Sequence, residues 1–169
     1  MVGAHLPAAV EIFEEIQSLA DNEFDSIKFQ KTPFDQEASV AAIFYEAIGA
    51  GLIDGITPLI SGYKEKYDLY AKWGRRKVVL EFKARLGNLT KDFNDAQKYF
   101  DEIDAVVCWE VTDSDRSSLG RMGIEVEEII PSAFADESDQ NLPNATHIMS
   151  LGGTRPVFVI DLKRHLVKR

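Results

Sequence analysis

The chain has 169 residues, of which 45% are hydrophobic and 28% charged, a composition that indicates one soluble globular domain spanning residues 1–169 and excludes a disordered or fibrous protein. No apolar run approaches the ~20 residues of a membrane span and no signal peptide is recognisable, so we expect a cytoplasmic protein with no membrane partner. The net charge of -9 argues against a nucleic-acid partner, but nine Lys/Arg against three Asp/Glu fall within residues 62–91 and make that segment basic.

Two amphipathic helices are predicted in the first fifty residues. The first runs from about Pro7 to Asp21, with apolar residues at helical spacing and glutamates between them, and is expected to pack. The second runs from about Phe34 to Ala50, where glycines end it. Glu46 lies on a stripe of mostly small residues of this helix, so we expect it to approach a sheet closely. The Gly- and Pro-containing segment from Gly55 to Gly62 is predicted to be irregular chain.

From Lys66 to Lys83 the pattern changes to period two, which predicts a hairpin of two strands with a turn at Gly74. Asp68 lies on the first strand, and Glu81 and Lys83 share one face of the second. A helix over residues 88–100 and a strand over 104–111 complete a βαβ crossover, so the strand ending in Lys83 and this later strand are expected to be parallel neighbours. Shorter strand patterns follow at 124–130, 146–150 and 157–162. The succession predicts an α/β fold with a central mixed sheet flanked by helices.

Asp68, Glu81 and Lys83 form a pattern suited to metal-dependent phosphodiester hydrolysis. The two carboxylates are ligands that Mg²⁺ or Mn²⁺ prefers, and the Phe82 carbonyl can complete the set because its side chain points to the opposite face. Lys83 is placed to orient or activate water and to stabilise charge on a phosphate. The basic residues expected to contact the nucleic-acid backbone are Lys72, Arg75, Arg76, Lys77, Arg85 and Lys91.

These residues resemble the motif of the PD-(D/E)XK nuclease superfamily, with Asp68 as the aspartate, Glu81-Phe82-Lys83 as the (D/E)XK segment, and a matching order of elements over residues 35–111. The resemblance implies a restriction-endonuclease-like fold with an αβββαβ-type core and a nuclease acting on nucleic acid, most readily DNA. In many members an acid of the preceding helix joins the metal site, and Glu46 occupies that place. The block from Glu81 to Trp109 also looks like nuclease modules appended to larger bacterial ATPases of defence systems, so further domains or partners are expected.

Two alternatives remain open from the sequence. Glu81 and Lys83 are also compatible with an ordinary ion pair on a half-exposed strand. The whole domain is also compatible with a catalytically inactive nuclease-fold module that acts in protein interaction or assembly through its acidic surfaces.

Cys108, the single cysteine, lies in an apolar run and is expected to be a buried thiol. Cleavage of both strands of a duplex with one site per chain would be consistent with a homodimer.

Overall fold

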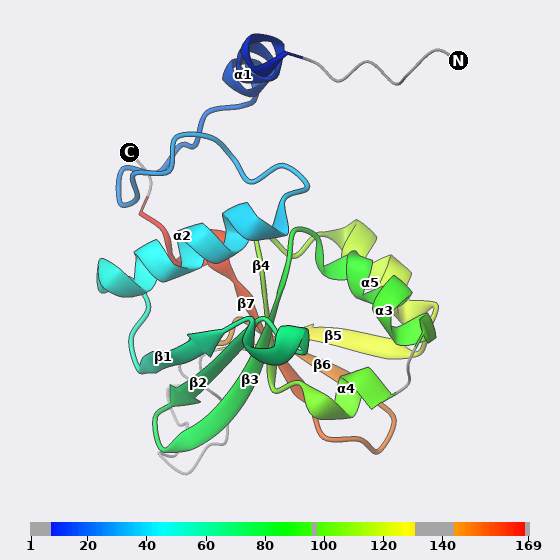
Figure 1. The fold of residues 1–169 in the computed structure, drawn as a ribbon. Coiled ribbons are helices and arrows are strands. Elements are labelled where there is room, and N and C mark those ends of the chain that lie inside the picture. The colour runs from blue at the N-terminus through cyan, green and yellow to red at the C-terminus, as the bar shows by residue number, and fades with distance from the viewer. Residues whose placement is uncertain (1–7, 96–97, 131–143, 168–169) are drawn as a thin grey trace.

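A computed structural model describes residues 8–95, 98–130 and 144–167 as one seven-stranded mixed sheet flanked by helices, in the strand order β1-β2-β3-β4-β7-β6-β5 (Figure 1). This architecture confirms the predicted α/β class with a mixed sheet. None of the described helices is long and apolar enough to cross a membrane. The strands are β1 (Ile56–Ser61), β2 (Leu69–Trp73), β3 (Arg76–Lys83), β4 (Ala105–Cys108), β5 (Ile124–Glu128), β6 (His147–Leu151) and β7 (Val157–Asp161). The helices are α1 (Ala9–Ser18), α2 (Glu37–Gly49), α3 (Leu89–Asp95), α4 (Lys98–Glu102) and α5 (Asp113–Gly120).

The centre of the sheet is parallel and its two flanks are antiparallel. β3 pairs with β4 in parallel, as predicted from the βαβ crossover, and β4 pairs with β7 in parallel as well. β1, β2 and β3 form an antiparallel meander on one side, and β7, β6 and β5 pair antiparallel on the other. The carboxyl ends of β3, β4 and β7 therefore meet at one edge of the sheet, where Lys83 is level with Cys108 and Cys108 with Asp161.

Two apolar cores cover the two faces of the sheet. α2 packs Val40 and Phe44 against the face that carries Leu80 and Phe82, and these residues belong to one cluster. α3 and α5 contribute to the second cluster on the opposite face, together with β4 and β7. Cys108 lies in this second core and is fully buried, as predicted, and burial raises the pKa of its thiol. Since β3 alternates its side chains, the face opposite Phe82 is the one that carries Glu81 and Lys83.

Two segments differ from the prediction. Residues 56–61, expected to be irregular, form the edge strand β1, five of whose six residues are exposed. An edge strand tolerates Pro58 because one side of the strand has no partner that needs its amide, and the pairing with β2 shifts register between Pro58 and Ile60. The helix predicted over 88–100 is instead two short helices, α3 and α4, with residues 96 and 97 outside the described part.

The sequence patterns also missed α5. Its signal is the capping box at Thr112 and Asp115, in which the Thr112 hydroxyl accepts a bond from the Asp115 amide (3.2 Å) and the Asp115 carboxylate accepts one from the Thr112 amide (2.9 Å). The helix has little apolar periodicity, because Leu119 is the one large apolar residue that it buries. A search for hydrophobic stripes therefore passes over it.

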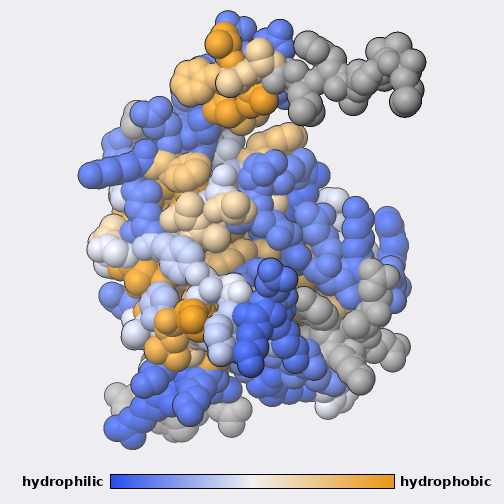
Figure 2. Space-filling view, in the orientation of Figure 1, coloured by the Kyte–Doolittle hydropathy of each residue, from blue (hydrophilic) through white to orange (hydrophobic). Residues whose placement is uncertain are grey.

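α1 confirms the predicted first helix but not its expected packing. None of its residues is buried, and Phe13 is 62% exposed. Figure 2 shows apolar side chains on this helix, which stands above the sheet and α2 in the view of Figure 1. The chain after α1 is held by an ion pair of 2.7 Å between Lys31 and Asp21. α1 therefore contributes little to the core of the described residues.

Phe44→Ala should lower the free energy of unfolding by about 3–5 kcal/mol, because Phe44 is fully buried between α2 and the sheet and meets Phe82 edge to face. Phe13→Ala is the matched control and should change stability by less than about 0.5 kcal/mol. Urea unfolding of both variants measures the difference. A loss at Phe13 as large as that at Phe44 would contradict the exposed position of α1.

Candidate functional site

The register of the β2–β3 hairpin brings Asp68 and Glu81 together. Leu69 pairs with Leu80, so the residue before Leu69 and the residue after Leu80 stand opposite each other. Side chains directly opposite in an antiparallel pair share a face, with their Cβ atoms roughly 5 Å apart. The Asp68 carboxylate also accepts a hydrogen bond of 2.8 Å from the Phe82 amide, which holds it against β3 beyond the last ladder pair. The two carboxylates predicted from the sequence are therefore neighbours.

Glu81 is buried with an incomplete set of partners. Its side chain is 4% exposed, and its Oε1 atom has no hydrogen-bond partner among the described residues. Burial, then the charge of Asp68 and a hydrogen bond shared with it, raise the pKa of Glu81 to about 8, although Lys83 acts in the opposite direction. Near neutral pH, and with nothing else bound, Glu81 therefore holds a proton.

Lys83 lies at the end of β3 and is only 9% exposed. Its Nζ atom forms ion pairs with Asp92 of α3 (2.8 Å) and Glu37 of α2 (3.2 Å). Burial lowers the pKa of Lys83, but the hydrogen bond to Asp92 and the charges of both carboxylates outweigh it and raise this pKa to about 12. The side chain is therefore a fixed ammonium group rather than a base.

Glu37 and Asp92 were not predicted as members of the site. Each lies in the first turn of its helix, α2 or α3, at the sheet edge where β3 ends. An acid in a first helical turn is common because it stabilises the helix dipole, so its position alone gives no signal of a further role. Their convergence on one lysine follows from the tertiary arrangement.

Glu46 does not join this group in the structure. Its carboxylate accepts a hydrogen bond from the backbone amide of Lys28, and no hydrogen bond or ion pair of the described residues links it to Asp68 or Glu81. The stripe of small residues that was expected to face the sheet includes Ala42 and Ala50, and both are exposed. α2 instead turns its large apolar residues toward the sheet, on the face opposite Glu81.

Tyr45 has a buried hydroxyl on which the charge of Asp68 acts. Its ring packs edge to face on Phe82, with the ring centroids 5.7 Å apart. Burial raises the pKa of this phenol, the Ser61 hydroxyl lowers it, and the charge of Asp68 raises it. Tyr45 is therefore a neutral phenol within electrostatic range of Asp68, and the sequence pattern did not identify it.

The residues at the Asp68–Glu81 pair fit a divalent cation. In a strand the amide and carbonyl of one residue point to the same neighbour, so the Phe82 carbonyl faces the end of β2 together with the amide that Asp68 binds. Across the described ranges, no three His, Cys, Asp or Glu side chains gather as a metal site. A cation here would rest on two carboxylates, a backbone carbonyl and water, which is a set that Mg²⁺ accepts.

The predicted basic residues divide into two groups. The turn after β2, where Gly74 has a φ of 61°, lies at the opposite end of the hairpin from Asp68 and Glu81 and forms the lower left tip in Figure 1. Lys77 is four residues from Glu81, about 13 Å along the strand. Arg85 and Lys91 lie on the side of Lys83, and both are exposed. The group at the turn comprises Lys72, Arg75, Arg76 and Lys77.

Glu81→Gln should flatten the pH dependence of stability of the metal-free protein. Since the pKa of Glu81 rises from 4.5 to about 8 on folding, the folded chain holds one more proton than the unfolded chain between these values. The stability from this proton is fully present below about pH 4.5 and is lost as the pH rises through about 8, with a slope of up to ~1.4 kcal/mol per pH unit.

Unfolding by urea in EDTA, followed from about pH 5 to about pH 8, measures the effect. His147, whose pKa burial lowers to about 4, titrates in both proteins, so the difference between the two curves reports Glu81. Parallel curves for wild type and Glu81→Gln would show that Glu81 is already ionised and would contradict its raised pKa.

No family model, curated protein or solved structure matches the chain. What the protein does must therefore be inferred from its own residues: a buried carboxylate pair, an adjacent ammonium group held by two acids, and the sheet edge at which they meet.

Proposed function

We propose that this protein is a metal-dependent nuclease of the PD-(D/E)XK type, which hydrolyses phosphodiester bonds of nucleic acid, with DNA as the expected substrate. The observation that carries the proposal is the pairing of Asp68 with Glu81 across the hairpin, with Lys83 two residues further on the same face. The order of α2, β1, β2, β3, α3 and β4 is also that of an αβββαβ core, which supports assignment to the restriction-endonuclease-like fold.

Asp68, Glu81 and the Phe82 carbonyl would hold Mg²⁺ or Mn²⁺, and Glu81 would give up its proton on binding. The bound cation supplies Lewis acidity and a water of lowered pKa. Lys83 keeps its proton, because Asp92 and Glu37 hold its pKa at about 12. Its part is to orient the attacking water and to stabilise negative charge on the phosphate.

Arg85 and Lys91 are the basic residues best placed to position the strand that is cut. Both are exposed and lie on the Lys83 side of the hairpin. The four basic residues around the β2–β3 turn would contact the nucleic-acid backbone farther from the site of cleavage. Contacts of this kind position a nucleic acid but do not read its sequence.

A second candidate is the catalytically inactive module. It is favoured by the two acids that already bind Lys83, which reduce the positive charge offered to a phosphate, and by the net charge of -9. Such a module would bind protein partners rather than cut nucleic acid. The first candidate predicts hydrolysis of nucleic acid that depends on Glu81 and Lys83, and the second predicts no hydrolysis by this protein.

Wild-type protein should hydrolyse plasmid or single-stranded DNA in the presence of Mg²⁺ or Mn²⁺, and Lys83→Met should lower the rate by about 10²–10³-fold because a preorganised charge is lost. Glu81→Gln should lower it at least as much, because a ligand of the cation is removed. Lys28→Met is the control, since Lys28 is an exposed lysine outside the hairpin and is assigned no contact with the cation or the nucleic acid. Gel electrophoresis of timed digests measures the rates.

Equal rates for wild type and all three variants would show that the cleavage comes from a contaminant and would contradict the catalytic assignment. Absence of cleavage by a folded wild-type protein, together with tight binding of a protein partner, would favour the inactive module.

Mn²⁺ should stabilise the wild type against thermal unfolding, by about 2.7 kcal/mol at a concentration of 100 Kd, because the cation binds the folded state alone. Asp68→Asn should lose this gain. Lys83→Met should keep it, since Lys83 is not a ligand. Melting temperatures with Mn²⁺ and with EDTA give the comparison, and equal stabilisation of Asp68→Asn would place the cation elsewhere.

A further inference from the structure

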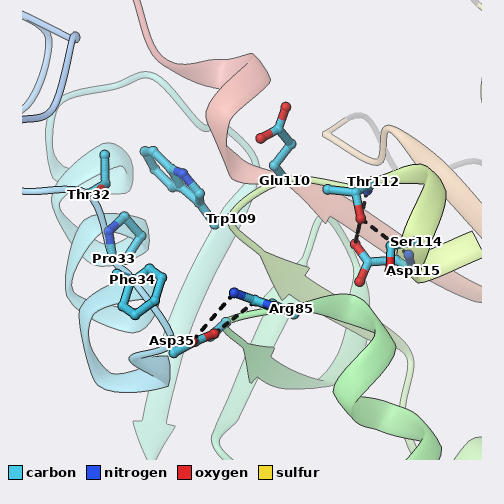
Figure 3. Close-up of a pocket in the computed structure, with 11 residues that line it drawn as sticks. Thr32, Pro33, Phe34, Asp35, Arg85, Trp109, Glu110, Thr112, Ser114 and Asp115 are labelled. Carbon is cyan, nitrogen blue, oxygen red and sulfur yellow. Dashed lines mark hydrogen bonds and ion pairs between the residues drawn. The ribbon is translucent and has the colours of Figure 1, made fainter. Parts of the chain in front are cut away.

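A pocket of about 380 Å³ lies beyond the carboxyl ends of β3 and β4 (Figure 3). Its walls come from the segment that precedes α2, from Ala84 and Arg85 directly after β3, and from residues 109–115 after β4. Lys83 immediately precedes Ala84, so the pocket adjoins the candidate site. This edge is where open α/β sheets bind their ligands, and the volume falls in the range of small-molecule sites.

Two aromatic side chains give this pocket an apolar wall. Phe34 is 60% exposed, and Trp109 is half-buried, with its ring held edge to face by Phe24 at 5.9 Å between centroids. Figure 3 shows Trp109 and Phe34 on the same side of the pocket, with the Arg85 guanidinium pointing toward Phe34 and Asp35. An exposed phenylalanine beside a positioned tryptophan offers flat surfaces for a planar ring.

Among the charged side chains that line the pocket, Arg85 is the one that can exchange its ion-pair partner. Asp115 caps α5 and accepts a bond from the Gly87 amide, and Glu110 pairs with Lys163 at 3.5 Å. Arg85 pairs with Asp35 at 2.8 Å, and both side chains are largely exposed, at 61% and 45%. An exposed pair of this kind contributes little to stability, so a phosphate can replace Asp35 on the guanidinium without a large loss.

We propose that the pocket binds an unpaired base of a DNA strand, stacked on Phe34 and Trp109, while Arg85 contacts the phosphate attached to that nucleotide. The inference rests on the proposed function for the position of the strand, whose neighbouring phosphodiester lies at Lys83. Lys83 and Arg85 are two residues apart, about 6–7 Å along an extended chain, which suits neighbouring groups of one strand.

This subsite selects a substrate class. In a duplex each base is stacked and paired, so filling the pocket requires that the base first leave the stack. A single strand, a frayed end or an unpaired nucleotide meets that condition at little cost. Stacking on an aromatic side chain tolerates any base, so the pocket confers a preference for unpaired DNA rather than for a sequence.

The test measures binding in EDTA, so that hydrolysis does not interfere. The probes are a short oligothymidylate labelled with a fluorophore, an abasic oligomer with the same number of phosphates, and a duplex of the same length. The oligothymidylate should bind about 5- to 150-fold more tightly than the abasic oligomer, the range expected for base–aromatic stacking, and more tightly than the duplex. It should also quench Trp109 fluorescence, whereas Trp73 is buried in the sheet and should not respond.

Phe34→Ala should remove most of the preference for the oligothymidylate and leave abasic binding unchanged, and Arg85→Gln should weaken both. Phe13→Ala, which changes an equally exposed phenylalanine of α1, is the control and should bind as the wild type does. Equal affinity for the two single strands, an unchanged preference in Phe34→Ala, or no binding of either oligomer would overturn the subsite.

Failure of the subsite can be told apart from failure of the proposed function. Base-dependent binding without hydrolysis after addition of Mn²⁺ would contradict the nuclease activity and support the subsite. Hydrolysis that depends on Lys83, with equal binding of the abasic and the natural strand, would support the nuclease and overturn the subsite.

Discussion

The register between β2 and β3 is the constraint on which the candidate site depends. With Leu69 opposite Leu80, Asp68 meets Glu81, Phe82 enters the core beneath α2, and Lys83 reaches the helix ends. A slip of one residue would place Glu81 in the apolar core and Phe82 on the opposite face, and it would therefore strongly destabilise the fold. The two-residue turn at Gly74, the bond from the Phe82 amide to Asp68 and the aromatic contacts of Phe82 all act to hold this register.

The two buried charged residues of β3 are stabilised in different ways. Lys83 has two carboxylates within ion-pair distance, so its burial is balanced by groups of opposite charge. The charge that acts most strongly on Glu81 is that of Asp68, another acid, and no ion pair of the described residues joins Glu81 to a cation. A network built for stability alone would pair Glu81 with a base. A buried acid whose pKa is raised by burial and then by a neighbouring acid is instead typical of sites that bind a cation or move a proton.

Period-two and period-3.6 patterns were sufficient to predict the hairpin, its faces, the parallel neighbour of β3 and the carboxylate pair, because these features depend on alternation within the chain and on crossover length. β1 was missed because edge strands need not alternate and tolerate proline, and α5 because its start is marked by a cap rather than by an apolar stripe. The sequence did not show which acid of α2 lies at the candidate site. Glu37 and Glu46 both lie on that helix, and its rotation against the sheet, set by Val40 and Phe44, decides which one reaches the strand end.

The charges around the site also suggest an order of events in the proposed reaction. Asp68, Glu37 and Asp92 surround Lys83 and Glu81, so the site carries net negative charge even while Glu81 holds its proton. A phosphodiester approaching that site would meet repulsion from three carboxylates against one ammonium group. A divalent cation on Asp68 and Glu81 would add two positive charges in place of the proton's one, so it would lower this repulsion without reversing it. In the proposed reaction the cation would therefore bind before the scissile phosphate, while contacts away from the carboxylates, at Arg85 and along the basic turn, would hold the strand beforehand.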